Sequence, residues 1–171
     1  QRFDSVRALL RKRGQAFSQR SSGAIPGASQ PVFLVDTLGE LQMFYAAADV
    51  AFVAGSLVPV GGHNLLEPAV LGLPMLSGPH THNAQDVAEL LQECGALRIV
   101  RSKEELAQRG GESFDDPARA RAEGALGRQA VAQSRGAVHR LVAMVAPLLS
   151  RPAAARAAAT AAGPSASSGT H

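Results

Sequence analysis

Residues 50–77, VAFVAGSLVPVGGHNLLEPAVLGLPMLS, decide the fold of this 171-residue chain. An apolar run at 50–54 is followed by a glycine-containing loop, a helical pattern over about 64–72 and a second apolar run at 74–77. Short apolar runs that alternate with helical segments are typical of βαβ units, whose parallel strands are buried on both faces. The stretch therefore predicts an α/β protein built on a parallel sheet.

The same alternation continues on both sides of this stretch. We expect further strands at 31–35 and 97–100, and a polar, Gly/Pro/Ser-rich loop over 18–30. The expected helices are at 3–13, after Thr37, at 84–94, after Ser102 (a short one), at 117–133 and at about 135–149. Thr37 with Glu40, and Ser102 with Glu105, have the spacing of a capping box. Together these elements predict a Rossmann-like sheet with helices on both faces.

Composition limits the class of protein. With 46% hydrophobic residues, the chain can bury the core of one domain, which we place at 1–150. Residues 151–171 are rich in Ala, Ser and Gly, and predict a disordered tail. The net charge is +3 and no basic block with interleaved aromatics occurs, so we expect no nucleic-acid partner. The single cysteine, Cys94, excludes an internal disulfide and a cysteine-built metal site.

The segment SLVPVGGHNLLE at 56–67 allows two interpretations. A glycine loop that leads into a helix offers free backbone N–H groups to a phosphate. Alternatively, the segment is a plain turn in which Asn64 caps the helix and Glu67 is its partner three residues later. Glu67 could also accept hydrogen bonds from ribose hydroxyls. Spacing alone leaves both interpretations open.

Three loops should share one edge of the sheet, because ligands bind at the carboxyl ends of parallel strands. These loops are 36–40, 55–64 and 78–83. His80 and His82 lack an obvious third ligand, so we expect no metal site. Ser56 is not part of a nucleophile elbow, and no pair of carboxylates has the pattern of an acid/base site.

A family resemblance emerges over residues 36–87, which contain the motifs D-T-x-G-E-L, G-G-H-N-x-x-E and G-P-H-T-x-N in that order. The segment closely resembles the C-terminal domain of 3-deoxy-D-manno-octulosonic acid (Kdo) transferases, and the similarity is strong over about 31–100. The resemblance implies a GT-B architecture of two Rossmann-like domains facing across a cleft. This chain would be the C-terminal, nucleotide-sugar-binding half, incomplete at its N-terminus.

What the resemblance implies about function is transfer of Kdo from CMP-Kdo to a lipid A precursor, in lipopolysaccharide core biosynthesis. No cofactor and no metal are implied. The family's N-terminal domain supplies the general base, the acceptor contacts and the membrane anchor. We therefore expect no catalytic residue in this chain, no activity from the chain alone, and a protein at the cytoplasmic face of the bacterial inner membrane.

The family's donor-binding residues carry over to matching positions of this sequence. They are Gly61, Gly62, His63 and Asn64 at the phosphate and Kdo, Glu67 at the ribose, and Gly39, Glu40 and Ser56 lining the donor cleft. Two alternatives stay open: a GT-B nucleotide-binding module without transferase activity, and a UDP-sugar epimerase-like protein. The epimerase-like alternative predicts binding of UDP in place of CMP.

Overall fold

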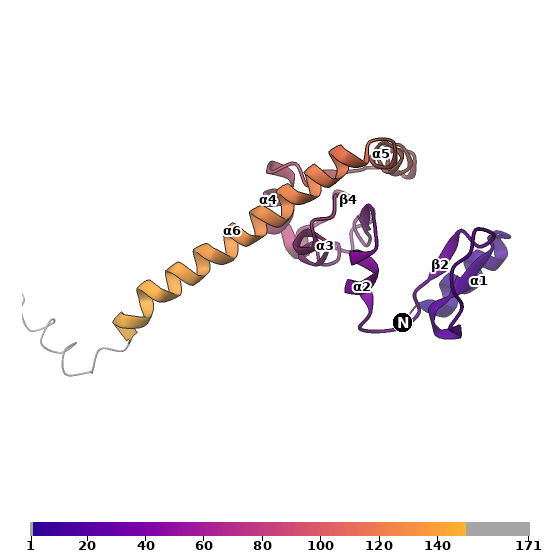
Figure 1. The fold of residues 1–171 in the computed structure, drawn as a ribbon, viewed down its shortest axis with the longest axis horizontal. Helices are drawn as coiled ribbons and strands as arrows, with labels where there is room; N and C mark the ends of the chain where they lie inside the picture. Colours follow the sequence, from indigo (N-terminus) through magenta and orange to yellow (C-terminus); the bar gives the residue numbers. More distant parts are fainter. Residues whose placement is uncertain (1, 150–171) are drawn as a thin grey trace, which may run out of the picture. The chain divides into compact units, whose positions relative to one another are not determined.

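Two compact units make up the described part of the chain. The computed structural model describes residues 2–149, and the side chains of residues 2–134. The first unit ends at Ala48 and the second begins at Asp49 (Figure 1). The tail predicted for 151–171 lies outside the described residues, and the assignment of 1–150 to one domain stays a prediction.

The first unit pairs two short parallel strands. Its elements are α1 (Phe3–Lys12), β1 (Phe17–Gln19), a 3₁₀ turn η1 (Arg20–Ser22), β2 (Val32–Leu34) and α2 (Leu41–Ala46). Phe17 lies opposite Val32, and Gln19 lies opposite Leu34. The loop predicted over 18–30 is therefore wrong at its start. The sequence FSQ has one apolar residue and no visible period, and only its pairing with β2 makes it a strand.

The second unit contains a three-stranded parallel sheet in the order β3-β4-β5. Its elements are β3 (Ala51–Val53), α3 (Leu66–Leu71), β4 (Met75–Ser77), a 3₁₀ turn η2 (His82–Ala84), α4 (Gln85–Glu93), β5 (Leu97–Ile99), α5 (Lys103–Asp115) and α6 (Pro117–Leu149). In register, Ala51 pairs with Met75 and Met75 pairs with Leu97. All four predicted strands exist, and the α/β class with parallel strands is confirmed.

Two helix predictions are wrong in extent. The helix after Ser102 is 13 residues long, and its cap is confirmed, since Ser102 Oγ accepts a hydrogen bond from the Glu105 N–H at 3.1 Å. The segments 117–133 and 135–149 form one continuous helix, α6. Ser134 and Gly136 weaken a helix only slightly, so they do not end it. No helix in the described part of the chain is both long and apolar enough to cross a membrane.

Helix α6 packs on the sheet unit through a stripe of small residues. Ala120, Gly124, Gly127 and Val131 lie at helical spacing and are buried. A Cβ built on Gly124 would overlap the backbone of Gly72, at the end of α3. The two backbones can approach closely only because Gly124 has no side chain. Figure 1 shows α6 crossing the elements α3 and α4 of this unit.

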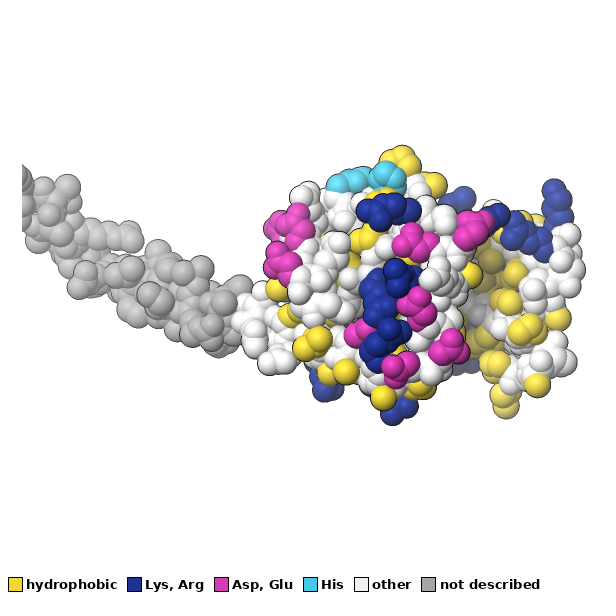
Figure 2. Space-filling view, turned by 90° about the horizontal axis from the view of Figure 1, so that it is seen from above, with side chains coloured by type: hydrophobic (Ala, Val, Ile, Leu, Met, Phe, Trp, Pro, Cys, Tyr) yellow, Lys and Arg dark blue, Asp and Glu magenta, His cyan; other side chains and the backbone are white. Residues whose placement is uncertain are grey.

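A network of charges joins β5 to the last two helices. Arg98 Nη1 lies 3.3 Å from Glu112 Oε2, and Arg98 also pairs with Glu123. Arg109 Nη1 donates to Glu112 Oε2 at 3.1 Å, and this hydrogen bond is the main reason that the pKa of Glu112 is lowered. Basic and acidic side chains are interspersed on the face seen in Figure 2, as expected for such a network.

Replacing Gly124 with Ala should separate α6 from the end of α3. We expect Gly124→Ala to lower the free energy of unfolding by about 1–3 kcal/mol, because overpacking a tight contact forces the backbone to move. Gly111→Ala in α5 is the matched control, since a Cβ there meets no atom within 4 Å. It should stabilise the chain by up to about 1 kcal/mol through helix propensity. Urea denaturation followed by circular dichroism measures both, and equal effects would contradict the packing argument.

Candidate functional site

The loops after β3 and β4 are joined at Ser56. This residue is fully buried, with 0% of its surface exposed. Its Oγ donates a hydrogen bond to Val53 O at 2.7 Å and accepts one from the Gly78 N–H at 2.8 Å. Ser56 O accepts from the His80 N–H at 3.0 Å. One residue therefore fixes the end of β3 to the loop that leaves β4.

The glycines of the first loop turn the backbone sharply. Gly61 has φ 105° and Gly62 has φ 75°, a region that favours glycine. The Gly62 N–H donates to Gly55 O at 2.9 Å, which closes the loop on itself. A Cβ on Gly61 would overlap the side chain of Asn83, and one on Gly62 would lie 3.3 Å from His80 O. The glycines therefore allow the two loops to pack together. This role is separate from allowing a ligand to come close to the backbone.

Asn83, in η2, holds the glycine loop through three hydrogen bonds. Its Nδ2 donates to Val60 O at 3.3 Å and to Gly62 O at 3.4 Å. Its backbone N–H donates to Gly61 O at 3.2 Å. Three successive carbonyl groups of the loop thus have their partner in a single residue.

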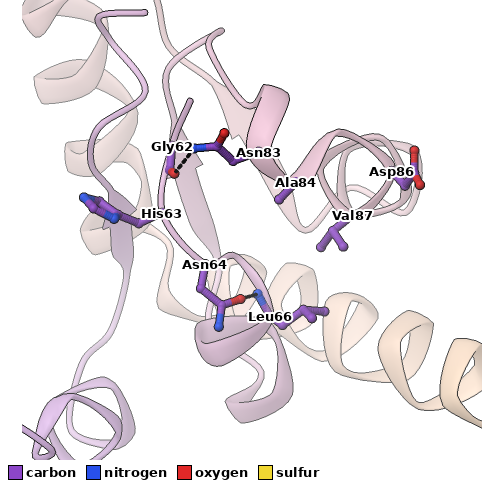
Figure 3. Close-up of a pocket in the computed structure, with 8 residues that line it drawn as sticks. All are labelled: Gly62, His63, Asn64, Leu66, Asn83, Ala84, Asp86 and Val87. Carbon is purple, nitrogen blue, oxygen red and sulfur yellow. Dashed lines mark hydrogen bonds between the residues drawn. The ribbon is translucent and has the colours of Figure 1, made fainter. Parts of the chain in front are cut away.

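A cavity of about 610 Å³ opens between the glycine loop and the start of α4. Its lining residues are Gly62, His63, Asn64, Leu66, Asn83, Ala84, Asp86 and Val87 (Figure 3). In Figure 3 the side chains of Leu66 and Val87 approach one another, and the imidazole of His63 points away from Asn83. That imidazole lies 3.2 Å from the Cβ position of Gly55, on the β3 side of the loop.

The cavity is bordered by backbone donors that the protein leaves unused. Among the described residues, the N–H groups of His63 and Asn64, which line the cavity, find no acceptor, and neither does the N–H of the buried Gly61. His63 and Asn64 are also exposed. A run of free N–H groups in a glycine turn is a favourable surface for an anion.

At the start of α3 the predicted N-cap is wrong: the N-cap position is Leu65, with no side-chain cap, and Asn64 stands one residue before it. Asn64 Oδ1 nevertheless accepts a hydrogen bond from the Leu66 N–H at 3.0 Å. Glu67, however, does not accept from the Asn64 backbone as a capping box requires. Its carboxylate accepts from the Asn64 side-chain amide at 3.0 Å. Glu67 is half-buried beside the loop, which leaves acceptor positions for a further partner.

In the first unit, Asp36 joins the loops that follow β1 and β2. Its carboxylate accepts hydrogen bonds from the Ser21 N–H at 2.9 Å, the Ser21 hydroxyl at 2.6 Å and Gln19 Nε2 at 2.9 Å. The Ser21 hydroxyl, followed by the Ser21 N–H, lowers the pKa of Asp36 from 3.8 to about 2. Asp36 thus connects the two strand ends of the first unit, as Ser56 connects the ends of β3 and β4 in the second.

Glu40 does not form the predicted capping box, and that prediction is wrong. Helix α2 begins only at Leu41, and Glu40 stands at the N-cap position with no side-chain cap. Its carboxylate accepts from the Thr37 hydroxyl and from Arg20 Nη2, the latter at 2.8 Å. The Thr37 bond first, and Arg20 second, lower the pKa of Glu40. Arg20 is 20 residues away in sequence, so local spacing does not reveal it as a partner of Glu40.

A second cavity, of about 640 Å³, lies in the first unit. It is lined by Arg20, Ser21, Gly23, Thr37, Leu38 and Glu40. Gly39 is exposed next to it, with φ 81°. The loop at 36–40 therefore belongs to the first unit, and its expected meeting with the two loops of the second unit stays a prediction.

The structure brings together most of the predicted site residues of the second unit. Gly62, His63 and Asn64 line one cavity, and Glu67 bonds to Asn64. Gly61 is buried in the same loop and does not line the cavity. Sequence reasoning missed Asn83, although the G-P-H-T-x-N motif ends on it. Within the described residues, no three His, Cys, Asp or Glu side chains lie close enough to hold a metal ion.

Comparisons with known proteins identify the family. No model of a known protein family matches the chain. It is 36% identical over 152 residues to the 3-deoxy-D-manno-octulosonic acid transferase of Haemophilus influenzae, a match that covers 88% of this chain and 36% of that protein. It is 47% identical over 97 residues to the transferase of the same name from Bordetella pertussis, covering 56% of this chain and 23% of that protein.

A solved structure shows which family the chain belongs to. The C-terminal CMP-Kdo binding domain of WaaA from Acinetobacter baumannii matches with a TM-score of 0.73 and 32% identity, covering 76% of this chain and 68% of that one. The chain belongs to the Kdo transferase family. Its likeness is to that family's C-terminal domain, and the chain spans only 36% and 23% of the two curated Kdo transferases.

Ser56→Ala should destabilise this member of the Kdo transferase family. The substitution removes the buried acceptor of the Gly78 N–H and the shorter of two bonds to Val53 O, which keeps only the 3.5 Å bond from the Ser77 hydroxyl. We expect a loss of about 1–3 kcal/mol in the free energy of unfolding. The control is Ser134→Ala, at an exposed position of α6. An equal, small change in both variants would show that the Ser56 hydroxyl does not join the strand ends.

Asp36→Asn should change how stability depends on acid. A lowered folded pKa contributes stability that is complete above the unfolded value of 3.8 and is lost as the pH falls towards about 2. The variant should therefore be less stable than the wild type at pH 6, and the difference should shrink between pH 4 and pH 2. Thermal unfolding over this range measures it, with exposed Asp49→Asn as control. A difference that does not depend on pH would contradict the assignment.

Proposed function

We propose that this chain is the donor-binding part of a Kdo transferase, which transfers Kdo from CMP-Kdo to a lipid A precursor in lipopolysaccharide core biosynthesis. The observation that carries the proposal is the glycine loop with free N–H groups at His63 and Asn64, both of which line the cavity. This loop occurs in a chain that is 32% identical to a CMP-Kdo binding domain. The observation favours a phosphate-containing ligand, and the relative supports CMP-Kdo.

The donor's phosphate would lie against the glycine loop. Helix α3 has only six residues, so the loop's own N–H groups are a more direct source of attraction than the helix dipole. Glu67 would accept hydrogen bonds from the ribose hydroxyls through the acceptor positions that Asn64 leaves unused. Ser56, whose buried hydroxyl is already bonded to Val53 O and to the Gly78 N–H, would support this site without touching the donor. The assignment of Gly39 and Glu40 to the donor cleft, which the family resemblance implies, stays a prediction.

The proposed reaction is a direct displacement at the anomeric carbon of Kdo. A hydroxyl oxygen of the acceptor forms the new bond, and the bond from that carbon to the CMP phosphate oxygen breaks. Negative charge grows on the departing phosphate, where the N–H groups of the glycine loop would stabilise it. The proton of the hydroxyl passes to a general base, which the family resemblance places in an N-terminal domain. The chain's own part is therefore to bind the donor and stabilise the leaving group.

The acceptor sets where the reaction would take place. A lipid A precursor has acyl chains that hold it in a membrane, so the enzyme must work at a membrane surface. We propose the cytoplasmic face of the bacterial inner membrane, where a nucleotide-activated sugar is available. The complete gene product should release CMP from CMP-Kdo only when the lipid acceptor is present.

Glu67→Ala should weaken the binding of CMP by about 1–3 kcal/mol, because hydrogen bonds from the ribose to a half-buried carboxylate would be lost. Isothermal titration calorimetry with CMP measures this. Glu93→Ala, at an exposed position of α4, controls for the loss of one negative charge.

Two results would argue against the assignment. A lower unfolding temperature with unchanged CMP affinity would limit Glu67 to a structural role at the start of α3. Tighter binding of UDP than of CMP to the wild type would contradict a CMP-Kdo donor and favour an epimerase-like protein.

A further inference from the structure

We propose that Asn83 is a positioning residue that orients the backbone donors of the glycine loop towards the ligand. The inference rests on the proposed donor site and extends it to a residue that acts through the loop. Asn83 lines the cavity, but both hydrogens of its amide are engaged by Val60 O and Gly62 O. The amide N–H groups therefore serve the loop and are not available to a ligand.

Because the peptide group is planar, a bond that fixes the direction of a carbonyl group also fixes the direction of the next residue's N–H. A carbonyl group and the N–H of the next residue lie in one plane and point in opposite directions. When Asn83 holds Val60 O, it fixes the direction of the Gly61 N–H. When it holds Gly62 O, it fixes the direction of the His63 N–H. The His63 N–H is one of the two free donors of the loop that line the cavity, whereas Gly61 is buried and does not line it.

The third carbonyl completes the arrangement. The Asn83 backbone N–H donates to Gly61 O, and the plane of that peptide contains the Gly62 N–H, which is bonded to Gly55 O. Consecutive glycines have more accessible conformations than any other pair, so the loop would not hold these planes by itself. The Asn83 amide approaches so closely that a Cβ on Gly61 would overlap it. Figure 3 shows the amide of Asn83 turned towards Gly62, with a hydrogen bond between them.

The donor character of the amide is the critical property. In Asn83→Asp, a carboxylate oxygen replaces the amino group and faces two carbonyl oxygens at the same distance. Repulsion should then turn the peptide planes of the loop while the size of the side chain is preserved. The matched control is Gln85→Glu, two residues away, which makes the same amide-to-carboxylate change. Gln85 is exposed, and its amide donates to Glu89 on α4 and not to the loop.

The test combines two measurements on wild type, Asn83→Asp and Gln85→Glu, at a temperature where all three are folded. Hydrogen exchange of the Gly62 amide, followed by NMR, reports the loop without any ligand. Calorimetry with CMP reports the site. We expect Asn83→Asp to speed Gly62 exchange and to raise the Kd for CMP by roughly tenfold each, as the loss of a pair of hydrogen bonds implies. Gln85→Glu should change neither.

The outcomes separate this inference from the proposed function. If the wild type binds CMP and Asn83→Asp binds it equally well, the positioning role is overturned and the donor site stands. If both variants weaken CMP equally, the added charge is the cause and the positioning role is again overturned. If the wild type binds no CMP, the proposed function fails. If Asn83→Asp leaves the hydrogen exchange of the Gly62 amide unchanged, Asn83 does not order the loop, and the positioning role is overturned whatever the affinity for CMP.

Discussion

The geometry of the second unit depends on how closely the backbone of Ser56 passes Gly78. A Cβ on Gly78 would overlap the carbonyl group of Ser56, so the two chain segments are in direct contact. The buried hydroxyl of Ser56 then bonds to both strand ends. This contact is possible because β3 and β4 are adjacent and parallel, so that both loops leave from the same edge. The glycine loop and the loop that carries Asn83 therefore both begin from fixed positions, at Ser56 and at Gly78.

The motifs G-G-H-N-x-x-E and G-P-H-T-x-N form one structural unit. The first supplies a loop whose ligand-facing groups are backbone N–H groups, and the second supplies Asn83, which bonds to the carbonyl groups of that loop. A surface made of backbone donors is only as ordered as its peptide planes, and these are set by the partners of the carbonyl groups. The absent Cβ of Gly61 leaves the space that Asn83 needs. Glycine is thus required here for the contact between the loop and Asn83.

Much of the fold could be predicted because it follows from local patterns. The runs at 50–54 and 74–77 are apolar, short and bounded by breakers, and both became strands at their expected places. The strand β1 could not be predicted, since Phe17–Gln19 has no period and depends on its partner β2. The capping box at Thr37 and Glu40 failed for a similar reason. Thr37 does bond to Glu40, but the helix begins only after Glu40, whose carboxylate also accepts from Arg20, a residue distant in sequence.

The same distinction applies within the candidate site. A motif identifies positions, but only geometry shows which polar groups remain available. The hydroxyl of Ser56 is buried and already has a donor and an acceptor, so a ligand could reach it only by breaking the joint between the strands. The N–H groups of His63 and Asn64 are exposed at the cavity and have no acceptor in the described part of the chain. Binding energy for an anion can therefore come from the loop backbone, while Ser56 and Asn83 act by holding that backbone in place.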